Sequence, residues 1–416
     1  MDGALPHVGD LSHAETRRGG EFLGRKDRKE GGPTSVSATI DRSGWKRVRL
    51  GEVLNLSDGD WIESKDQSES GYRLIQTGNI GAGEFVYHQE RARFISAETF
   101  ARLKCTEVFS GDCLISRLPD PIGRACILPA SQNRMITAVD CAIARPIDNV
   151  IDRRFFVYFT STVDYKRQME KALMGSTRQR ISRKSLNEVL IPLPEIEIQE
   201  TIVSSLSAID TLCSALKSLI AKYEAIKKAT INLLLEPKAG WKRMKLDEIC
   251  MCLDNYRKPV NEVERASMHG DIPYCGANGI VDYVNDFTID DSIILIAEDG
   301  GYFDQYESRP IAYRMSGKAW INNHAHILKA KRDYCQDFIF YSLEYKDITP
   351  FITSGTRAKL TKGELSNIEI DTPSSFQEQR KIAEKIIAID NALADYKAQL
   401  EKARKLKAGM MSYFFG

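Results

Sequence analysis

Residues 195–237 read EIEIQETIVSSLSAIDTLCSALKSLIAKYEAIKKATINLLLEP. Apolar residues recur in this stretch at alternating intervals of four and three, which is the 3.5-residue period of a coiled-coil seam. Lys227 and Thr230 interrupt the pattern near its end. The spacing predicts one long helix with a seam formed by Ile202, Leu206, Ile209, Cys213, Leu216, Ile220, Tyr223 and Leu234.

The same register returns in the second half of the chain, within residues 374–416, where Lys407 interrupts it. Pro194 and Pro373 precede the two stretches, and a proline near the first turn of a helix removes no hydrogen bond. The pattern predicts a second helix that pairs with the first. Two ordinary amphipathic helices, each lying on its own domain, are the alternative. The second seam is formed by Ile382, Ile386, Ile389, Leu393, Tyr396, Leu400, Ala403, Met410 and Phe414.

Short motifs outside the seams also recur in one order, which indicates an internal duplication. The residues between them, 75–155 and 270–335, share little beyond apolar alternation. The chain is therefore a repeated frame with two different inserts. The clearest motif pairs are 44–50 (GWKRVRL) with 240–246 (GWKRMKL), 177–182 with 356–361, and 208–210 with 388–390.

Connectivity predicts the direction of the two helices. The second insert begins where the first helix ends and finishes where the second begins. In a parallel pair these points would lie roughly 50 Å apart at 1.5 Å per residue, whereas in an antiparallel pair they are neighbours. An antiparallel pair also brings the C-terminal residues 414–416 near Trp45, where the first domain begins.

We therefore predict an α/β (α+β) fold with two pseudo-symmetric domains joined by two long antiparallel coiled-coil helices. Residues 1–43 contain seven glycines and balanced charges, so we predict a disordered extension or an upstream start, with a nucleic-acid-binding arm as the alternative. The predicted parts are 1–43 (extension), 44–194 (first domain), 195–237 (first spacer helix), 238–373 (second domain) and 374–416 (second spacer helix).

Composition limits the class of protein. The chain has 416 residues, nine cysteines without regular spacing and a formal net charge of +1. The charge argues against histone-like bulk binding to DNA, but a local basic patch needs only a few lysines and arginines. We expect free thiols in a reducing cytoplasm, no signal segment and no membrane span, because no apolar run approaches the length that a bilayer requires.

A spacer with a different domain at each end suits the reading of two half-sites. Half-sites one DNA turn apart are roughly 34–36 Å from centre to centre, which a helix pair of this length can span. Because the inserts differ, the expected target is asymmetric.

Several motifs resemble those of the specificity subunits of Type I restriction–modification systems. They are Gly44-Trp45-Lys46 leading into Leu50, Gly175-Ser176-Thr177 before Ile181-Ser182, and the run 191–194 before a helix. In the second half, the runs 274–279 (YCGANG) and 317–326 (GKAWINNHAH) resemble one common target-recognition subtype. The resemblance covers about residues 44–416. One departure is Ile198-Gln199-Glu200, where the family usually has Glu-Gln, as at Glu378-Gln379.

The resemblance implies a non-catalytic, cytoplasmic subunit that binds double-stranded DNA through two target-recognition domains. It implies that the helices bind two adenine methyltransferase subunits, with two motor–nuclease subunits as possible further partners. S-adenosylmethionine, ATP and magnesium would belong to those partners, and this chain would hold no cofactor and no metal.

The residues expected to contact DNA are hydroxyls, amides and cations in loops, because such groups bind phosphate oxygens and base edges. A solvated turn is the alternative for the loop around Arg178, and a structural role is the alternative for each insert residue. The loop candidates are Ser176, Thr177, Arg178, Arg180, Lys184, Thr356, Arg357 and Lys359; the insert candidates are Gln76, Asn79, Arg117, Arg124, Asn278, Tyr302, Asn322 and Asn323.

A second apolar row runs beside the seams. A two-helix coil needs only one seam, so the extra row predicts a partner helix, with contact to the chain's own domains as the alternative. The predicted partner-binding residues are Leu212, Leu219, Ile226, Leu233, Leu406 and Tyr413.

Catalytic and metal sites are not expected. His324 and His326 alternate without a further ligand at metal-site spacing, and Glu298-Asp299 reads as a hydrogen-bonded loop rather than a nuclease pair. The sequence has no Walker A loop and no Asn-Pro-Pro-Tyr-like methyltransferase motif. A protein-interaction scaffold without DNA reading is the main alternative function, and an unrecognised nuclease or methyltransferase is the second.

Overall fold

The computed structural model describes residues 42, 44–119, 121–173, 179–353 and 358–416. The chain divides into the units Met1–Gly44 and Trp45–Gly416, and every element below belongs to the second unit. The predicted extension 1–43 lies almost wholly outside the described residues.

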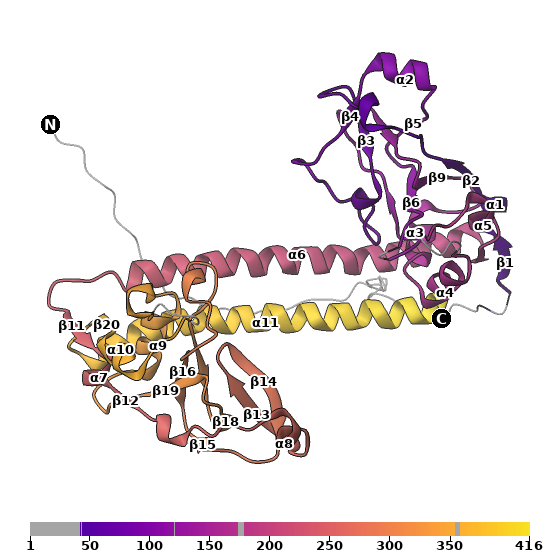
Figure 1. Cartoon of the computed structure of the whole chain (residues 1–416). Coiled ribbons are helices and arrows are strands. Elements are labelled where there is room, and N and C mark those ends of the chain that lie inside the picture. The colour runs from indigo at the N-terminus through magenta and orange to yellow at the C-terminus, as the bar shows by residue number, and fades with distance from the viewer. Residues whose placement is uncertain (1–41, 43, 120, 174–178, 354–357) are drawn as a thin grey trace, which may run out of the picture. The chain divides into compact units, whose positions relative to one another are not determined.

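Two long helices, α6 (Ile196–Leu234) and α11 (Phe376–Phe415), pack along one another (Figure 1). Their cross-helix pairs run in opposite senses: Asp210 meets Lys407, Glu224 meets Lys397, and Lys227 meets Asp390. The helices are therefore antiparallel, and the predicted helix pair is confirmed.

The predicted seam forms the contact between α6 and α11. At its centre one apolar cluster combines Ile209, Cys213 and Leu216 of α6 with Leu400 and Ala403 of α11. Full burial of a leucine or isoleucine side chain stabilises a fold by about 1.5–3 kcal/mol, so the repeated seam positions account for the pairing.

α6 is also long and apolar enough, by length and composition alone, to cross a membrane. This differs from the expectation that the chain contains no such segment. Only a third of the apolar window is buried in the fold. Composition alone is weak evidence for a span, and the buried positions of this helix are those that contact α11 and the flanking domains.

The described residues of the first domain form three sheets, and each pairs strands that are distant in sequence. Their strand orders are β1 (Lys46–Arg49)–β10 (Leu190–Leu193); β2 (Leu54–Asp58)–β9 (Cys141–Pro146)–β6 (Cys113–Ser116)–β7 (Ala125–Ile127); and β4 (Phe94–Ile95)–β3 (Tyr72–Ile75)–β8 (Met135–Thr137)–β5 (Glu107–Val108). The helices of this domain are α1 (Leu50–Val53), α2 (Ala97–Leu103), α3 (Arg153–Phe159), α4 (Val163–Lys171) and α5 (Arg183–Asn187).

The second domain repeats this topology strand for strand. Its orders are β11 (Lys242–Lys245)–β20 (Glu369–Thr372); β12 (Cys250–Cys252)–β19 (Ala325–Ala330)–β16 (Ile293–Ala297)–β17 (Ala312–Met315); and β14 (Gly279–Val284)–β13 (His269–Gly276)–β18 (Lys318–Ile321)–β15 (Ile289–Asp290). Its helices are α7 (Leu246–Ile249), α8 (Glu262–Ala266), α9 (Gln336–Glu344) and α10 (Lys362–Asn367).

The correspondence extends to strand direction. The pairs β3–β8 and β13–β18 are parallel, while the four-stranded sheets built on β9 and β19 are antiparallel. The two inserts, so different in sequence, therefore form the same scaffold, and the predicted α/β class with two pseudo-symmetric domains is confirmed.

A buried glutamine attaches each domain to the start of one long helix. The Gln199 side chain accepts from the backbone N–H of Asp152 (2.9 Å) and donates to the carbonyl oxygen of Pro194 (2.8 Å). Gln379 makes the matching pair with Cys335 (2.8 Å) and Pro373 (2.9 Å). These bonds satisfy polar groups that burial would otherwise leave without partners.

The C-terminal turn of α11 returns to the first domain. The ring of Phe415 packs 5.1 Å from that of Phe155 and 6.3 Å from that of Phe159. The first domain thus contacts the start of α6 and the end of α11, and the second domain contacts the end of α6 and the start of α11. All nine cysteines lie in the described residues and are free thiols.

Candidate nucleic-acid interface

The two loops predicted to contact DNA leave corresponding positions of the two domains. Ser176, Thr177 and Arg178 of the first loop, and Thr356 and Arg357 of the second, lie outside the described residues. The structure describes the residues that follow them. The backbone N–H of Ile181 donates to the carbonyl oxygen of Arg117 (3.0 Å), and that of Leu360 donates to the carbonyl oxygen of Glu298 (2.8 Å). Because β6 and β16 occupy the same place in their sheets, Arg117 and Glu298 are equivalent positions.

A charged cluster lies at the base of the first loop. It consists of Asp58, Arg117, Asp140 and Arg180, and we call it the first hub. The buried guanidinium of Arg117 pairs with Asp58 at 2.5 Å and donates to the carbonyl oxygen of Ile181 at 2.8 Å. Arg180 donates to the carbonyl oxygen of Val139 (2.8 Å) and lies 3.3 Å from Asp140. Burial lowers the pKa of Arg117, and the Asp58 carboxylate opposes that shift. Arg117 and Arg180 therefore hold the end of the loop through contacts within the protein.

The second hub, formed by Asp254, Arg257, Glu298, His326 and Lys359, occupies the same place in the second domain. Glu298 accepts from Lys359 at 2.7 Å and from Arg257. The two ring nitrogens of buried His326 face the Asp254 carboxylate (2.7 Å) and the carbonyl oxygen of Leu360 (2.8 Å). Both ring nitrogens of His326 therefore have an oxygen partner within hydrogen-bond distance.

The carboxylates of the second hub are held in their charged forms. Burial alone would raise the pKa of Asp254, but hydrogen bonds from His326 and the Ile327 N–H, with the charges of His326 and Arg257, bring it below its ordinary value. Burial alone would also raise the pKa of Glu298, but hydrogen bonds from Lys359 and Arg257 outweigh burial and lower it. The equivalent position thus carries a cation in one domain and an anion in the other.

The remaining candidates of the first insert support a turn. Arg124 donates to the carbonyl oxygens of Ile80 (2.5 Å) and Thr77 (2.9 Å). The Asn79 side chain donates to the carbonyl oxygen of Val86 (3.0 Å) and accepts from the N–H of Gln76 (3.0 Å). These side chains brace residues 76–80, so substituting Arg124 or Asn79 would change the shape of the turn as well as any contact to DNA. Lys184, in contrast, is exposed.

The second-insert candidates lie around the turn that joins β13 to β14. Asn278 donates to the carbonyl oxygen of Gly300 (2.9 Å), two residues before exposed Tyr302. Buried Asn322 accepts from the N–H of His324 (2.8 Å), while Asn323 is exposed. The structure therefore leaves Tyr302 and Asn323 facing solvent and gives Asn278 and Asn322 partners within the fold.

Two residues of the second hub form, with neighbouring Cys252, a group that has metal-ligand chemistry. Atoms of Cys252, Asp254 and His326 lie within 4.8 Å of one another. Burial raises the pKa of Cys252 to about 11, which keeps it a thiol, and the Asp254 carboxylate already accepts from the Ile327 N–H and lies 3.1 Å from Arg257. Hydrogen bonds and a guanidinium thus already occupy these donors, and we assign no metal to them.

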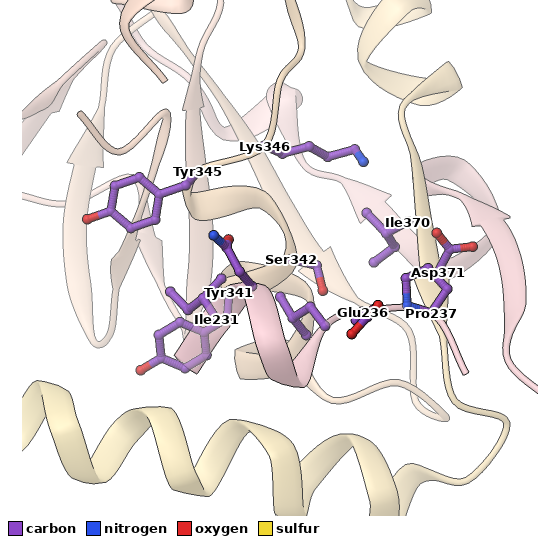
Figure 2. Close-up of a pocket in the computed structure, with 11 residues that line it drawn as sticks. Ile231, Glu236, Pro237, Tyr341, Ser342, Tyr345, Lys346, Ile370 and Asp371 are labelled. Carbon is purple, nitrogen blue, oxygen red and sulfur yellow. The ribbon is translucent and has the colours of Figure 1, made fainter. Parts of the chain in front are cut away.

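A groove of about 340 Å³ lies in the second domain beside the end of α6 (Figure 2). Its walls combine apolar and charged groups, and none of them was a predicted site residue. Ile231, Glu236 and Pro237 come from α6 and the residues after it, while Lys346 and Asp371 come from the domain. Burial lowers the pKa of Lys346. The groove therefore lies where the end of α6 meets the second domain.

The second apolar row of the spacer helices faces solvent. All six predicted partner-binding residues are among the exposed large apolar side chains, from 37% exposed at Leu219 to 68% at Leu233. Each precedes by one residue either an apolar seam position or one of the lysines, Lys227 and Lys407, that interrupt the seam. In an antiparallel pair the rows of α6 and α11 therefore flank the same side of the seam. Large apolar side chains gathered on one exposed face are uncommon on a soluble monomer. The row comprises Leu212, Leu219, Ile226, Leu233, Leu406 and Tyr413.

A duplicated domain on an antiparallel helix pair, with a loop at an equivalent place in each copy, defines a two-headed recognition protein. Residues 42–228 and 238–403 match the family described as Type I restriction modification DNA specificity domain. The chain belongs to this family and is a specificity subunit of a Type I restriction–modification system.

Curated relatives agree with this assignment. The chain is 39% identical to a putative type I restriction enzyme specificity subunit of Haemophilus influenzae over 34% of this chain and 35% of the relative. It is 25% identical to the type I restriction enzyme MjaVIII specificity subunit of Methanocaldococcus jannaschii over 48% and 47%, respectively. The match thus spans between a third and a half of each relative's length.

The fold is also similar to a solved structure. The Type I restriction-modification S subunit from M. genitalium superposes with a TM-score of 0.63 at 18% identity, covering 92% of this chain and 98% of that one. At this identity the likeness concerns the fold alone.

Proposed function

We propose that this specificity subunit reads a bipartite, asymmetric DNA site, with one half-site bound by each domain. The observation that carries the proposal is the pair of domains with one topology and opposite charges at equivalent loop bases, Arg117 and Glu298. Two domains with the same fold but opposite charges at the loop base would be suited to bind two different DNA half-sites.

In this proposal the loops 174–178 and 354–357, with Arg180 and Lys359 at their ends, approach the DNA backbone. Hydroxyls and cations bind phosphate oxygens, and arginine can also form a pair of bonds with guanine. Among the candidates of the second insert, Tyr302 and Asn323 are exposed. They could therefore contact DNA without breaking a hydrogen bond within the domain.

The helix pair would bind two adenine methyltransferase subunits through the exposed apolar row. The pseudo-symmetry of α6 and α11 supports two copies, because Leu406 and Tyr413 hold the same register positions in α11 as Ile226 and Leu233 hold in α6. Motor–nuclease subunits would join that core. S-adenosylmethionine, ATP and magnesium would be bound by these partners, and the assembly would act in the cytoplasm.

Methylome sequencing tests the proposal directly. Cells would express the methyltransferase encoded beside this chain, with and without the chain. We expect a two-part asymmetric motif, methylated on adenine, that disappears when this chain is absent. A folded complex with the methyltransferase but no chain-dependent motif would instead favour a protein-interaction scaffold. S-adenosylmethionine binding by the purified chain would favour an enzyme.

A further inference from the structure

The lysines that interrupt the two seams make matching contacts between the long helices. Lys407 of α11 forms an ion pair with Asp210 of α6 at 2.5 Å, and Lys227 of α6 forms one with Asp390 of α11 at 2.7 Å. Lys407 follows Lys227 along the chain by the same interval at which Asp390 follows Asp210, which is the interval between the two seams. Each break in the apolar pattern is therefore a charged contact that the pseudo-symmetry repeats.

A tyrosine from each domain completes these contacts. The hydroxyl of Tyr158 in α3 donates to Asp210 (2.9 Å), and that of Tyr341 in α9 donates to Asp390 (2.6 Å). Each lysine also lies 5.5 Å from the ring of the tyrosine at its own site. We call Tyr158–Asp210–Lys407 the first clasp and Tyr341–Asp390–Lys227 the second clasp.

Each clasp joins three separate parts of the chain through one carboxylate. Apolar surfaces tolerate small rotations and sliding, because dispersion and burial depend weakly on direction. Hydrogen bonds to a charged carboxylate are short and directional, and a polar pair within an apolar seam fixes its register. A clasp therefore determines how a recognition domain is oriented on the helix pair.

The second clasp is the more buried and the more extensively bonded. Lys227 also pairs with buried Glu344 at 2.7 Å, and Arg314 donates to Asp390 and to the hydroxyl of Tyr341, both at 3.2 Å. The Lys227 side chain is 10% exposed, compared with 34% for Lys407.

Within the part of the chain that the structure describes, the first domain has no counterpart to these additional groups. By strand register and helix position, Ile127 and Ser161 stand where the second domain has Arg314 and Glu344. The first domain is thus held by fewer charged bonds than the second.

We propose that the two clasps are positioning devices that set the spacing accepted between the two DNA half-sites, with the second holding its domain more rigidly than the first. This inference rests on the proposed reading of a bipartite site. The tyrosines contact no predicted DNA-binding residue among those described, so they would act through orientation alone.

The test uses the chain assembled with its methyltransferase and DNA substrates in which the half-sites are fixed and the spacer length varies. We expect wild type to discriminate against a spacer changed by one base pair by about tenfold or more, the scale of one mismatched base pair. Tyr341→Phe should reduce that discrimination to about threefold without changing the half-site sequences. Tyr158→Phe should have a smaller effect, because the first clasp is the weaker.

Glu224→Gln is the matched control. It removes the pair with Lys397 (2.9 Å), which joins the same two helices and belongs to neither clasp, and it should leave the spacing profile unchanged. A Tyr341→Phe profile identical to wild type, in a variant that unfolds at the wild-type temperature, would overturn the proposal.

Hydrogen exchange in the isolated chain provides a readout that does not depend on DNA reading. Tyr341→Phe should speed exchange in α9 at least about threefold more than Glu224→Gln does, because local opening follows the loss of local bonds. If wild type methylates no bipartite site, the proposed function fails. The exchange rates of Tyr341→Phe and Glu224→Gln would still show whether the second clasp holds α9 in place. Equal exchange in the two variants would then overturn the proposed role of the clasp.

Discussion

The indole Nε1 of Trp241 donates a hydrogen bond to Oε1 of Glu378 at 3.2 Å, tying the start of the second domain to the start of α11. The first domain has Trp45 at the matching position, but Ile198 stands where Glu378 would be. Among the described residues, the buried Nε1 of Trp45 has no hydrogen-bond partner. One substitution between the repeats has therefore left a donor unsatisfied.

Replacing Ile198 with glutamate should restore this bond in the first domain. A buried donor without a partner destabilises a fold, and a new hydrogen bond contributes a net ~1 kcal/mol. We expect Ile198→Glu to raise the free energy of unfolding by up to about that amount, measured by urea denaturation. The gain should vanish in a Trp45→Phe background, and a gain that persists there would assign it to another cause.

The second hub should make the stability of its domain sensitive to acid. The pKa values of Asp254 and Glu298 are lowered in the folded state, so their contribution is complete above the unfolded carboxyl range of about 4–4.5 and is lost as the pH falls through the folded values. Arg257 and Lys359 are the cations that face these carboxylates, and the ring of His326 lies against Asp254. Urea midpoints measured from pH 7 to pH 3 should fall less steeply for Asp254→Asn than for wild type. Parallel curves would remove Asp254 from the acid response.

Neighbouring leucines on α6 should separate folding from partner binding. Leu216 is buried in the seam and Leu219 is 37% exposed. Leu216→Ala should lower stability by about 2–4 kcal/mol through loss of packing. Leu219→Ser should change stability by no more than about 0.5 kcal/mol and weaken methyltransferase binding by about tenfold or more in a titration. Wild-type affinity in Leu219→Ser would exclude this side chain from the docking surface.

Arg178, predicted from the sequence to bind DNA, should make one phosphate contact or base contact. Arg178→Ala should weaken DNA binding by the assembled complex and reduce the slope of log affinity against log salt by about 1 if the contact is to phosphate. Arg404→Ala is the control, since Arg404 pairs with Glu401 of its own helix. A loss of stability without a change in salt dependence would favour a structural turn.

The sequence was most informative where one physical interaction repeats along the chain. Seam residues such as Leu206 and Leu393 are buried where the 3.5-residue period predicts, because helix pairing depends on periodic apolar contacts that are local in sequence. The exposed positions of Leu212 and Leu406 likewise follow from that register.

The shared scaffold of the inserts could not be predicted in the same way. Alternation of apolar residues defines a strand but not its neighbours, and the pairing of β3 with β8 joins segments that are far apart in the sequence. Candidates such as Arg117 and Arg124 were chosen by residue type, which does not distinguish a guanidinium that faces DNA from one that binds a carbonyl of its own fold. Asp58 and Arg257 gave no signal, because their partners lie far away in sequence.

The opposite charges of Arg117 and Glu298 bear on how such a chain could be re-engineered. Both loops end in a cation, but each cation has a different carboxylate as its partner. Lys359 pairs with Glu298 at the base of its own loop, whereas Arg180 lies in the same hub as the Arg117 guanidinium and pairs with Asp140. A loop transplanted alone would lose the carboxylate with which its cation was paired. The smallest exchangeable cassette is therefore the loop together with the hub beneath it, because only that exchange keeps each cation with its own partner.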